Sequence, residues 1–168
     1  MILELLHLYT SPGHNFFGRH GEAAGQHPIQ ECADLHCVAG RGIRDDRFFD
    51  YKENYKGQIT FFSDEVYQSL CHQFRVWDKP ASVFRRNVIT RGWRLNSLIG
   101  EQFAVQGVLF FGVEECKPCY WMDQAFCPGA EAALKGRGGL RARILTDGIL
   151  RVTVPAVAPH ELVPAAAA

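Results

Sequence analysis

Short β-type segments separated by glycine-rich loops run through most of the chain, and this arrangement constrains the fold more than any other feature. Residues 58–62, QITFF, are β-branched and aromatic and lie between Gly57 and Ser63, which predicts a buried strand. Residues 102–115, QFAVQGVLFFGVEE, predict one or two strands with a kink or turn at Gly107. Further strands are expected at 2–9, 30–39 and 86–90, and a hairpin is expected over 140–154.

Helical signals are few and lie mostly in the second half of the chain. Ser63 is a good N-cap, and an apolar stripe predicts a helix over 64–74. A second helical region, 120–136, is expected to be interrupted at Pro128 and closed by Gly136. These helices do not alternate strictly with the strands, which disfavours a parallel doubly wound sheet. We therefore expect a β-rich fold, mainly an antiparallel or mixed β-barrel with a few peripheral helices.

The 168 residues suit one domain, expected at 1–154 and followed by a loose tail at 155–168. Lys plus Arg and Asp plus Glu both number 18, so the chain lacks the positive excess of a nucleic-acid-binding protein. The first ten residues have no basic leader, and no apolar stretch is long enough to span a membrane. We expect a cytoplasmic protein without nucleic-acid or membrane partners, whose six cysteines stay reduced.

Cys116 and Cys119 stand two residues apart behind the apolar run at 102–115 and allow three interpretations. A redox couple would resemble thioredoxin locally, but the chain after Pro155 lacks the hairpin and helix that such a fold needs. A structural zinc site needs a second ligand pair, for which Cys32 and Cys37 are weak candidates. The third interpretation is that one sulfur works alone on a larger cofactor.

The third interpretation draws on a longer pattern. The segment 85–119, RRNVITRGWRLNSLIGEQFAVQGVLFFGVEECKPC, resembles the core of the MOSC domain, the C-terminal domain of molybdenum cofactor sulfurases. The matching residues are Arg86-Asn87, Thr90, Gly92, Leu98, Gly100, Phe103, Gly107 and Pro118-Cys119. Residues 40–50 and 136–152 resemble two further segments of that family, and the opening loop 11–21 resembles a small stand-alone bacterial type. The sequence departs from the family pattern at Asp45, where glycine is usual, and at Val152-Thr153, where Gly-Asp is usual.

The resemblance implies a cofactor and a set of site residues. The cofactor would be the molybdenum cofactor, an anionic molybdopterin, and Cys119 would be the catalytic residue, binding molybdenum directly or carrying sulfur as a persulfide. The implied activity is that of a sulfur carrier or a molybdenum oxidoreductase, and the implied partners are a cysteine desulfurase or a molybdoenzyme. The expected cofactor-binding residues are Arg47, Arg86, Asn87, Thr90, Arg137, Arg141 and Arg143.

The residue chemistry agrees with this resemblance. Arginine suits phosphate by charge and by its forked geometry, and a thiolate is a soft ligand that suits a sulfur-rich metal centre. Arg85, Arg94 and Arg151 are also consistent with solvated surface. His14, His20 and His27 predict either a metal site or a role in closing the pocket. The alternative function is a structural or redox domain that uses zinc or the Cys-x-x-Cys thiols without molybdenum.

Overall fold

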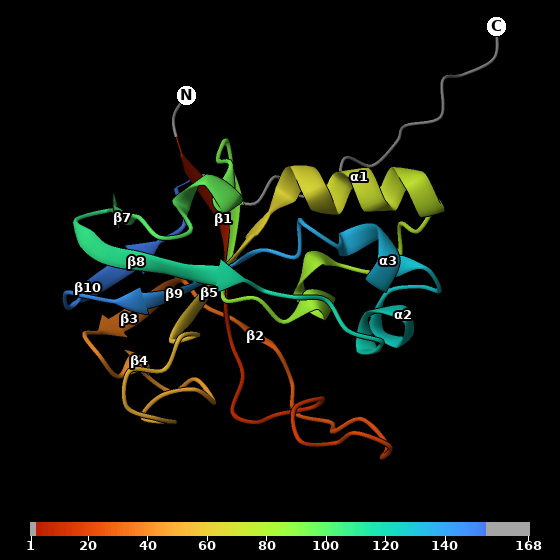
Figure 1. The fold of residues 1–168 in the computed structure, drawn as a ribbon, viewed down its shortest axis with the longest axis horizontal. Coiled ribbons are helices and arrows are strands. Elements are labelled where there is room, and N and C mark those ends of the chain that lie inside the picture. The colour runs from red at the N-terminus through yellow and green to blue at the C-terminus, as the bar shows by residue number, and fades with distance from the viewer. Residues whose placement is uncertain (1–2, 154–168) are drawn as a thin grey trace, which may run out of the picture.

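A computed structural model describes residues 3–153, and the strands in this part of the chain form two sheets. The larger sheet has seven strands in the order β2-β1-β6-β5-β9-β8-β7, and the smaller has the order β10-β3-β4 (Figure 1). The larger sheet contains β1 (Glu4–Thr10), β2 (Gln30–Glu31), β5 (Ile59–Ser63), β6 (Val88–Arg91), β7 (Gln102–Val105), β8 (Val108–Glu115) and β9 (Leu140–Ile144). The smaller sheet contains β3 (Asp34–Val38), β4 (Gly42–Ile43) and β10 (Gly148–Arg151).

The predicted β-rich fold is confirmed, but the predicted barrel is not observed. β5 and β6 are parallel, whereas the other strand pairs of both sheets are antiparallel, so the architecture is mixed. β2 and β7 form the two edges of the larger sheet, and within residues 3–153 these edges are not joined by a strand pair.

Both faces of the larger sheet are covered. The helices are α1 (Asp64–Phe74), α2 (Trp121–Ala125) and α3 (Ala130–Leu134), with short 3-10 turns η1 (Ala81–Phe84) and η2 (Leu95–Leu98). Figure 1 shows α1, α2 and α3 together on one side of the molecule, away from the smaller sheet. Adjacent strand residues point to opposite faces. Phe61 belongs to a core shared with β3, β4 and β10, and Phe62 to a core shared with the helices.

The bounds of the longest helix, α1, were predicted correctly from local sequence signals. α1 spans Asp64–Phe74, the range expected from the apolar stripe, and the Ser63 hydroxyl accepts a hydrogen bond from the Val66 amide at 3.2 Å. That bond satisfies one of the free amide groups of the first helical turn. The helical region at 120–136 is interrupted around Pro128 as expected, which separates α2 from α3.

Two strand predictions were wrong, one in its pairing and one in its extent. β9 and β10 do not form a hairpin, because β5 and β8 already occupy both edges of β9. β10 instead pairs with β3 in the smaller sheet. The single strand expected over 30–39 is likewise divided, since β2 pairs with β1 and β3 pairs with β10 and β4.

β7 and β8 form a hairpin whose two turn residues, Gln106 and Gly107, both have positive φ. This backbone conformation is the one that the commonest two-residue hairpin turns require. Further along β8, the Gly100 amide donates to the Gly112 carbonyl and the Gly112 amide donates to the Glu101 carbonyl. The chain after η2 therefore lies directly against β8 at Gly112, where a side chain would overlap with the Leu98 carbonyl oxygen.

Gly112→Ala is expected to lower the free energy of unfolding by about 2–3 kcal/mol, because two backbones must separate to admit the methyl group. Gly107→Ala is a matched control, since Gly107 has open space around it and only its positive φ opposes a side chain, which costs ~1 kcal/mol. Urea unfolding of both variants measures the difference. Equal losses would show that the close contact between Gly112 and the Leu98 carbonyl does not limit the size of the side chain at this position.

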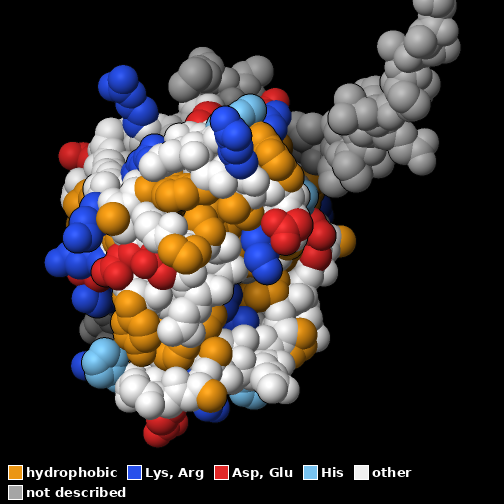
Figure 2. All heavy atoms as spheres, turned by 90° about the vertical axis from the view of Figure 1, so that its right-hand side faces the viewer, with side chains coloured by type: hydrophobic (Ala, Val, Ile, Leu, Met, Phe, Trp, Pro, Cys, Tyr) orange, Lys and Arg blue, Asp and Glu red, His pale blue; other side chains and the backbone are white. Residues whose placement is uncertain are grey.

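The helical side of the surface mixes apolar and charged side chains. Figure 2 shows hydrophobic patches with Lys, Arg, Asp and Glu side chains between and around them. No helix in the described part of the chain is both long enough and apolar enough to cross a membrane. The domain end expected after 154 and the tail expected at 155–168 lie outside the described residues.

Candidate functional site

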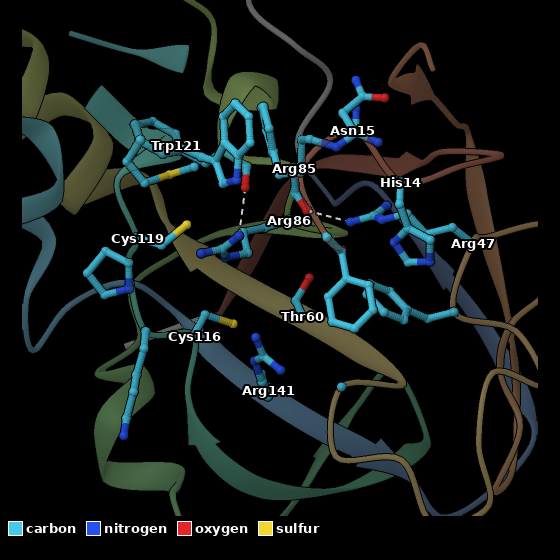
Figure 3. A pocket seen from close by; sticks show the side chains of 18 of the residues that line it. His14, Asn15, Arg47, Thr60, Arg85, Arg86, Cys116, Cys119, Trp121 and Arg141 are labelled. Carbon is cyan, nitrogen blue, oxygen red and sulfur yellow. Dashed lines mark hydrogen bonds between the residues drawn. The ribbon is translucent and has the colours of Figure 1, made fainter. Parts of the chain in front are cut away.

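A cavity of about 380 Å³ opens between two loops and the ends of several strands. Its walls come from the loop after β1, the loop before β5, the residues that follow η1, the segment after β8, and β9. Figure 3 shows Cys116 and Cys119 on one side of it and His14 and Arg47 on the other. We call the first side the cysteine end.

Glycines hold the cysteine segment in place. The Cys116 amide donates to the Gly139 carbonyl at 2.8 Å, and the Gly138 amide donates to the Glu115 carboxylate at 2.9 Å. A side chain at Gly138 would overlap with the Cys116 carbonyl oxygen. The glycine pair before β9 therefore lets two backbone segments approach closely, and this contact positions the cysteines at the cavity wall.

The two cysteines have different surroundings. Cys116 is 2% exposed, whereas Cys119 is an exposed residue, and both are free thiols on the cavity wall. Burial raises the pKa of the Cys116 thiol, while the positive charges of Arg86 and Arg141 act in the opposite direction. Cys119 is thus the sulfur that an incoming molecule can reach, and Cys116 is buried beside Arg86 and Arg141.

The cavity wall is cationic. Its charged residues are Arg47, Arg85, Arg86, Lys117 and Arg141, and no Asp or Glu lines it within the described residues. Charges of one sign around a cavity attract a ligand of the opposite sign. The cavity therefore suits an anion.

Two of these arginines are occupied by protein partners. Arg85 is buried and donates to the Ser11 hydroxyl and to the Gly13 and His27 carbonyls at 2.7–3.2 Å, and desolvation by burial lowers the pKa of Arg85 to about 10. Arg47 lies 3.3 Å from the buried Asp46 carboxylate and donates to the Arg85 carbonyl at 3.1 Å. The interpretation of Arg85 as solvated surface is therefore wrong, because it ties the loop after β1 to the body of the protein.

Arg86 keeps a donor for a ligand, and Arg141 lies beside Cys116 and Tyr55 without a close carboxylate partner. Arg86 donates from Nε to the Gly138 carbonyl at 3.2 Å and from Nη1 to the Phe84 carbonyl at 2.7 Å, and no bond from its Nη2 is found within residues 3–153. The nearest carboxylate to Arg141 is Glu114, at 3.8 Å, and this carboxylate also lies 2.7 Å from the Lys56 ammonium group. The uncompensated positive charge of the cavity is therefore concentrated at the cysteine end.

Aromatic rings form the wall beside Cys119. The Tyr120 and Trp121 rings stack with centroids 4.8 Å apart, and the Phe16 ring lies 4.9 Å from the Trp121 ring. The Tyr120 hydroxyl is buried and has no hydrogen-bond partner in the described part of the chain. Because a buried hydroxyl without a partner is costly, this group suits a hydrogen bond to a bound molecule.

The predicted site residues divide into two groups. Arg47, Arg86, Arg141 and Cys119 line the cavity. The other four, Asn87, Thr90, Arg137 and Arg143, are not on its wall.

Each of the four outlying residues has a structural partner. Asn87 is buried and bonds Thr60, Tyr9 and Asp46, and the Thr90 hydroxyl donates to the Phe62 carbonyl. Arg137 donates to the Ala133 carbonyl and to Ser69, and the Arg143 guanidinium lies 5.1 Å from the Phe111 ring centroid.

Of the three histidines considered, His14 and His20 line the cavity and His27 does not. Sequence analysis assigned no site role to Arg85 or to the aromatic residues of the wall. The glycine-rich loop at 11–21 gave the only signal, because it carries two histidines and two phenylalanines, unlike an inert spacer.

The zinc interpretation finds no support in the geometry. Within residues 3–153 no three His, Cys, Asp or Glu side chains are grouped so that they could hold a metal ion. Cys37, a candidate for the second ligand pair, is 2% exposed in the core, and burial raises the pKa of its thiol to about 12. A thiol in such surroundings behaves as a small apolar group.

Comparison with known proteins decides the family. The model of the MOSC domain family matches residues 50–155, more than half of the chain. The chain belongs to the MOSC domain family. This family is associated with molybdenum cofactor binding and sulfur-related function.

Solved structures show the same fold. This MOSC chain is similar to the YuaD protein from Bacillus subtilis, with a TM-score of 0.68 and 18% identity over 90% of this chain and 92% of that chain. It is also similar to YiiM from Escherichia coli, with a TM-score of 0.63 and 16% identity over 92% of this chain and 68% of that chain. No curated protein sequence matches the chain.

Proposed function

We propose that this MOSC protein binds the molybdenum cofactor in the cavity, with its anionic groups at the cysteine end. The observation that carries the proposal is an exposed thiol, Cys119, on a cavity wall with five Arg and Lys side chains and no carboxylate in the described part of the chain. A wall of this kind suits a ligand that is both anionic and bound through sulfur.

The residues at the cysteine end fit the parts of such a cofactor. Arg86 and Arg141 would hold the phosphate, because guanidinium groups bind phosphate in a forked geometry. The aromatic wall at Tyr120 and Trp121 suits a flat pterin ring, and the unpartnered Tyr120 hydroxyl would bond a polar atom of the ligand. The Cys119 thiolate would be the soft ligand. When bound, the cofactor would supply electron transfer or accept sulfur.

The exposure of Cys119 supports a second role for the same site, that of a sulfur carrier. Its thiolate would attack the outer sulfur of a persulfide on a cysteine desulfurase. The new S–S bond forms on Cys119 as the donor S–S bond breaks, and the donor cysteine leaves as a thiolate. A molybdoenzyme would then receive the sulfur. Binding of the cofactor and transfer of sulfur are compatible, because both need an accessible thiolate beside the arginines.

The test is to purify the protein from a host that makes the cofactor and to measure bound molybdenum and oxidised pterin per chain. The double variant Arg86→Gln and Arg141→Gln is expected to lower both contents by at least about tenfold, since charge-assisted hydrogen bonds are lost. Arg94→Gln is the control, because Arg94 is exposed and lies off the cavity wall. A wild type without molybdenum or pterin, or a double variant that loads normally, would contradict the proposal.

A further inference from the structure

Five aromatic side chains gather at the cavity side opposite the cysteines, and we call them the aromatic cluster: His14, Phe17, Phe48, Tyr51 and Tyr55. The His14 and Phe48 rings lie 4.8 Å apart between centroids, the Phe48 and Tyr55 rings 5.1 Å, and the Tyr51 and Tyr55 rings 4.9 Å. All of them except Tyr51 line the cavity. The rings belong to two loops far apart in the sequence, so the fold brings them together.

The outer rings of the aromatic cluster are open to solvent. Phe17 is 55% exposed and Tyr51 is 42% exposed. Exposed apolar groups that adjoin one another beside a cavity mark a binding surface more often than a packing defect. The aromatic faces at this end of the cavity are therefore available to a ligand.

This end of the cavity carries less uncompensated charge than the cysteine end, and the guanidinium that reaches it without a close carboxylate partner is that of Arg141, beside Tyr55. The Asp46 carboxylate neutralises Arg47, whose guanidinium also lies 5.0 Å from the Phe48 ring centroid. Arg85 donates hydrogen bonds to the Ser11 hydroxyl and to backbone carbonyls. An anion should therefore bind more favourably at the cysteine end, and the aromatic cluster is better suited to an uncharged molecule.

His14 supplies the polar group of the aromatic cluster. Its ring makes no hydrogen bond within residues 3–153, and burial, followed by the charge of Arg47, lowers its pKa below the usual value. The imidazole is therefore neutral near pH 7 and can both donate and accept a hydrogen bond. A ligand with a polar edge on a flat ring would satisfy it.

We propose that the aromatic cluster is a second subsite of the cavity and binds an uncharged, planar aromatic or heteroaromatic molecule. Rings at centroid distances of 4.8–5.9 Å present faces and edges on which another ring can stack. His14 bonds the polar edge of that molecule. If the proposed function holds, this molecule is the substrate that reacts at the cysteine end, and only its role as substrate rests on that function.

Benzamide and cyclohexanecarboxamide test the subsite, because they share an amide and a ring size but only benzamide is flat. In an NMR titration of the purified protein that follows the His14 imidazole signals, benzamide is expected to bind about two- to tenfold more tightly. Phe17→Ala should remove much of this preference, because Phe17 lines the cavity, and its side chain is exposed, so the fold should survive. Trp77→Ala is the control, since Trp77 is 61% exposed and does not line the cavity.

Three results would overturn the subsite. The first is equal affinity for the flat and the puckered amide, and the second is benzamide binding that Phe17→Ala does not weaken. The third is displacement of benzamide by free 6-methylpterin, together with an equal loss of affinity for both molecules in Phe17→Ala. That result would assign these rings to the cofactor. Failure of the proposed function would be seen separately, as a wild type that contains no molybdenum or pterin. The benzamide titration does not depend on that result, because it needs no cofactor.

Discussion

Cys119→Ser is expected to abolish loading of the molybdenum cofactor or of sulfur, whereas Cys116→Ser should only weaken it. Cys119 is exposed on the cavity wall and matches the Pro-Cys pair of the family motif. A serine hydroxyl stays protonated at neutral pH, so it can neither replace a soft thiolate ligand nor hold a persulfide. Loading should fall by at least the ~10–100-fold that the loss of a supporting partner costs at other metal sites.

Cys116 should behave differently because it is buried, and burial raises the pKa of its thiol. A hydroxyl in its place costs about 1–3 kcal/mol of unfolding free energy if it finds no partner. The cavity should keep its shape, and loading should fall only as far as the segment loosens. Cys127→Ser is the control, since Cys127 is partly exposed and does not line the cavity.

Measuring loading, disulfide formation and melting temperature on these variants separates the three interpretations of the cysteine pair. A redox couple would make both substitutions equally damaging and would give the wild type a reversible disulfide between Cys116 and Cys119. A zinc site would make both equally damaging through lost stability, and a chelator would unfold the wild type. Equal loss of loading together with an accessible disulfide would overturn the role assigned to Cys119.

The elements that sequence analysis predicted correctly depend on local chemistry. The start of α1 follows from the Ser63 hydroxyl, and the turn between β7 and β8 follows from Gly107. The error over β9 and β10 has another cause, because strand pairing depends on which distant strands occupy each edge. The sequence of 140–154 indicated two strands. It did not indicate that β5 and β8 would pair with the two edges of β9.

The candidate site was predictable in part from the family resemblance. That resemblance implied Arg86 and Arg141 as cofactor-binding residues, and both line the cavity. Arg143 lies on the same strand face as Arg141 but about 6–7 Å further along β9, where it meets Phe111 instead. Arg85 was interpreted as solvated surface because its three hydrogen-bond acceptors lie 58 to 74 residues away in the sequence.

Asn87 shows best how a residue of the family motif can contribute to the fold. Its side-chain oxygen accepts bonds from the Thr60 amide at 3.0 Å and the Thr60 hydroxyl at 2.8 Å, and its amide nitrogen donates to the Tyr9 carbonyl and the Asp46 carboxylate. The residue is 3% exposed. This one side chain joins β1, β5 and the loop that carries Arg47. It therefore stabilises the elements from which the cavity wall is built.

Asn87→Asp is therefore expected to lower the free energy of unfolding at pH 7.5 by about 4 kcal/mol, because two buried donors are replaced by an oxygen that faces a carboxylate and a carbonyl. Burial and the Asp46 carboxylate would raise the pKa of the new carboxyl in the folded state above its unfolded value. The folded state then binds the extra proton more readily, so the deficit should shrink as pH falls towards 5.

Urea unfolding of wild type and Asn87→Asp at pH 7.5 and pH 5.5 measures both effects, with Asn96→Asp as the control. Asn96 is exposed, and within residues 3–153 its side chain makes a single hydrogen bond, to the Gly136 carbonyl, so its change should cost less than about 1 kcal/mol at either pH. If Asn87 instead bound the cofactor directly, Asn87→Asp would unfold like the wild type and lose only loading. A deficit at pH 7.5 that shrinks at pH 5.5 in Asn87→Asp alone identifies the buried network as its role.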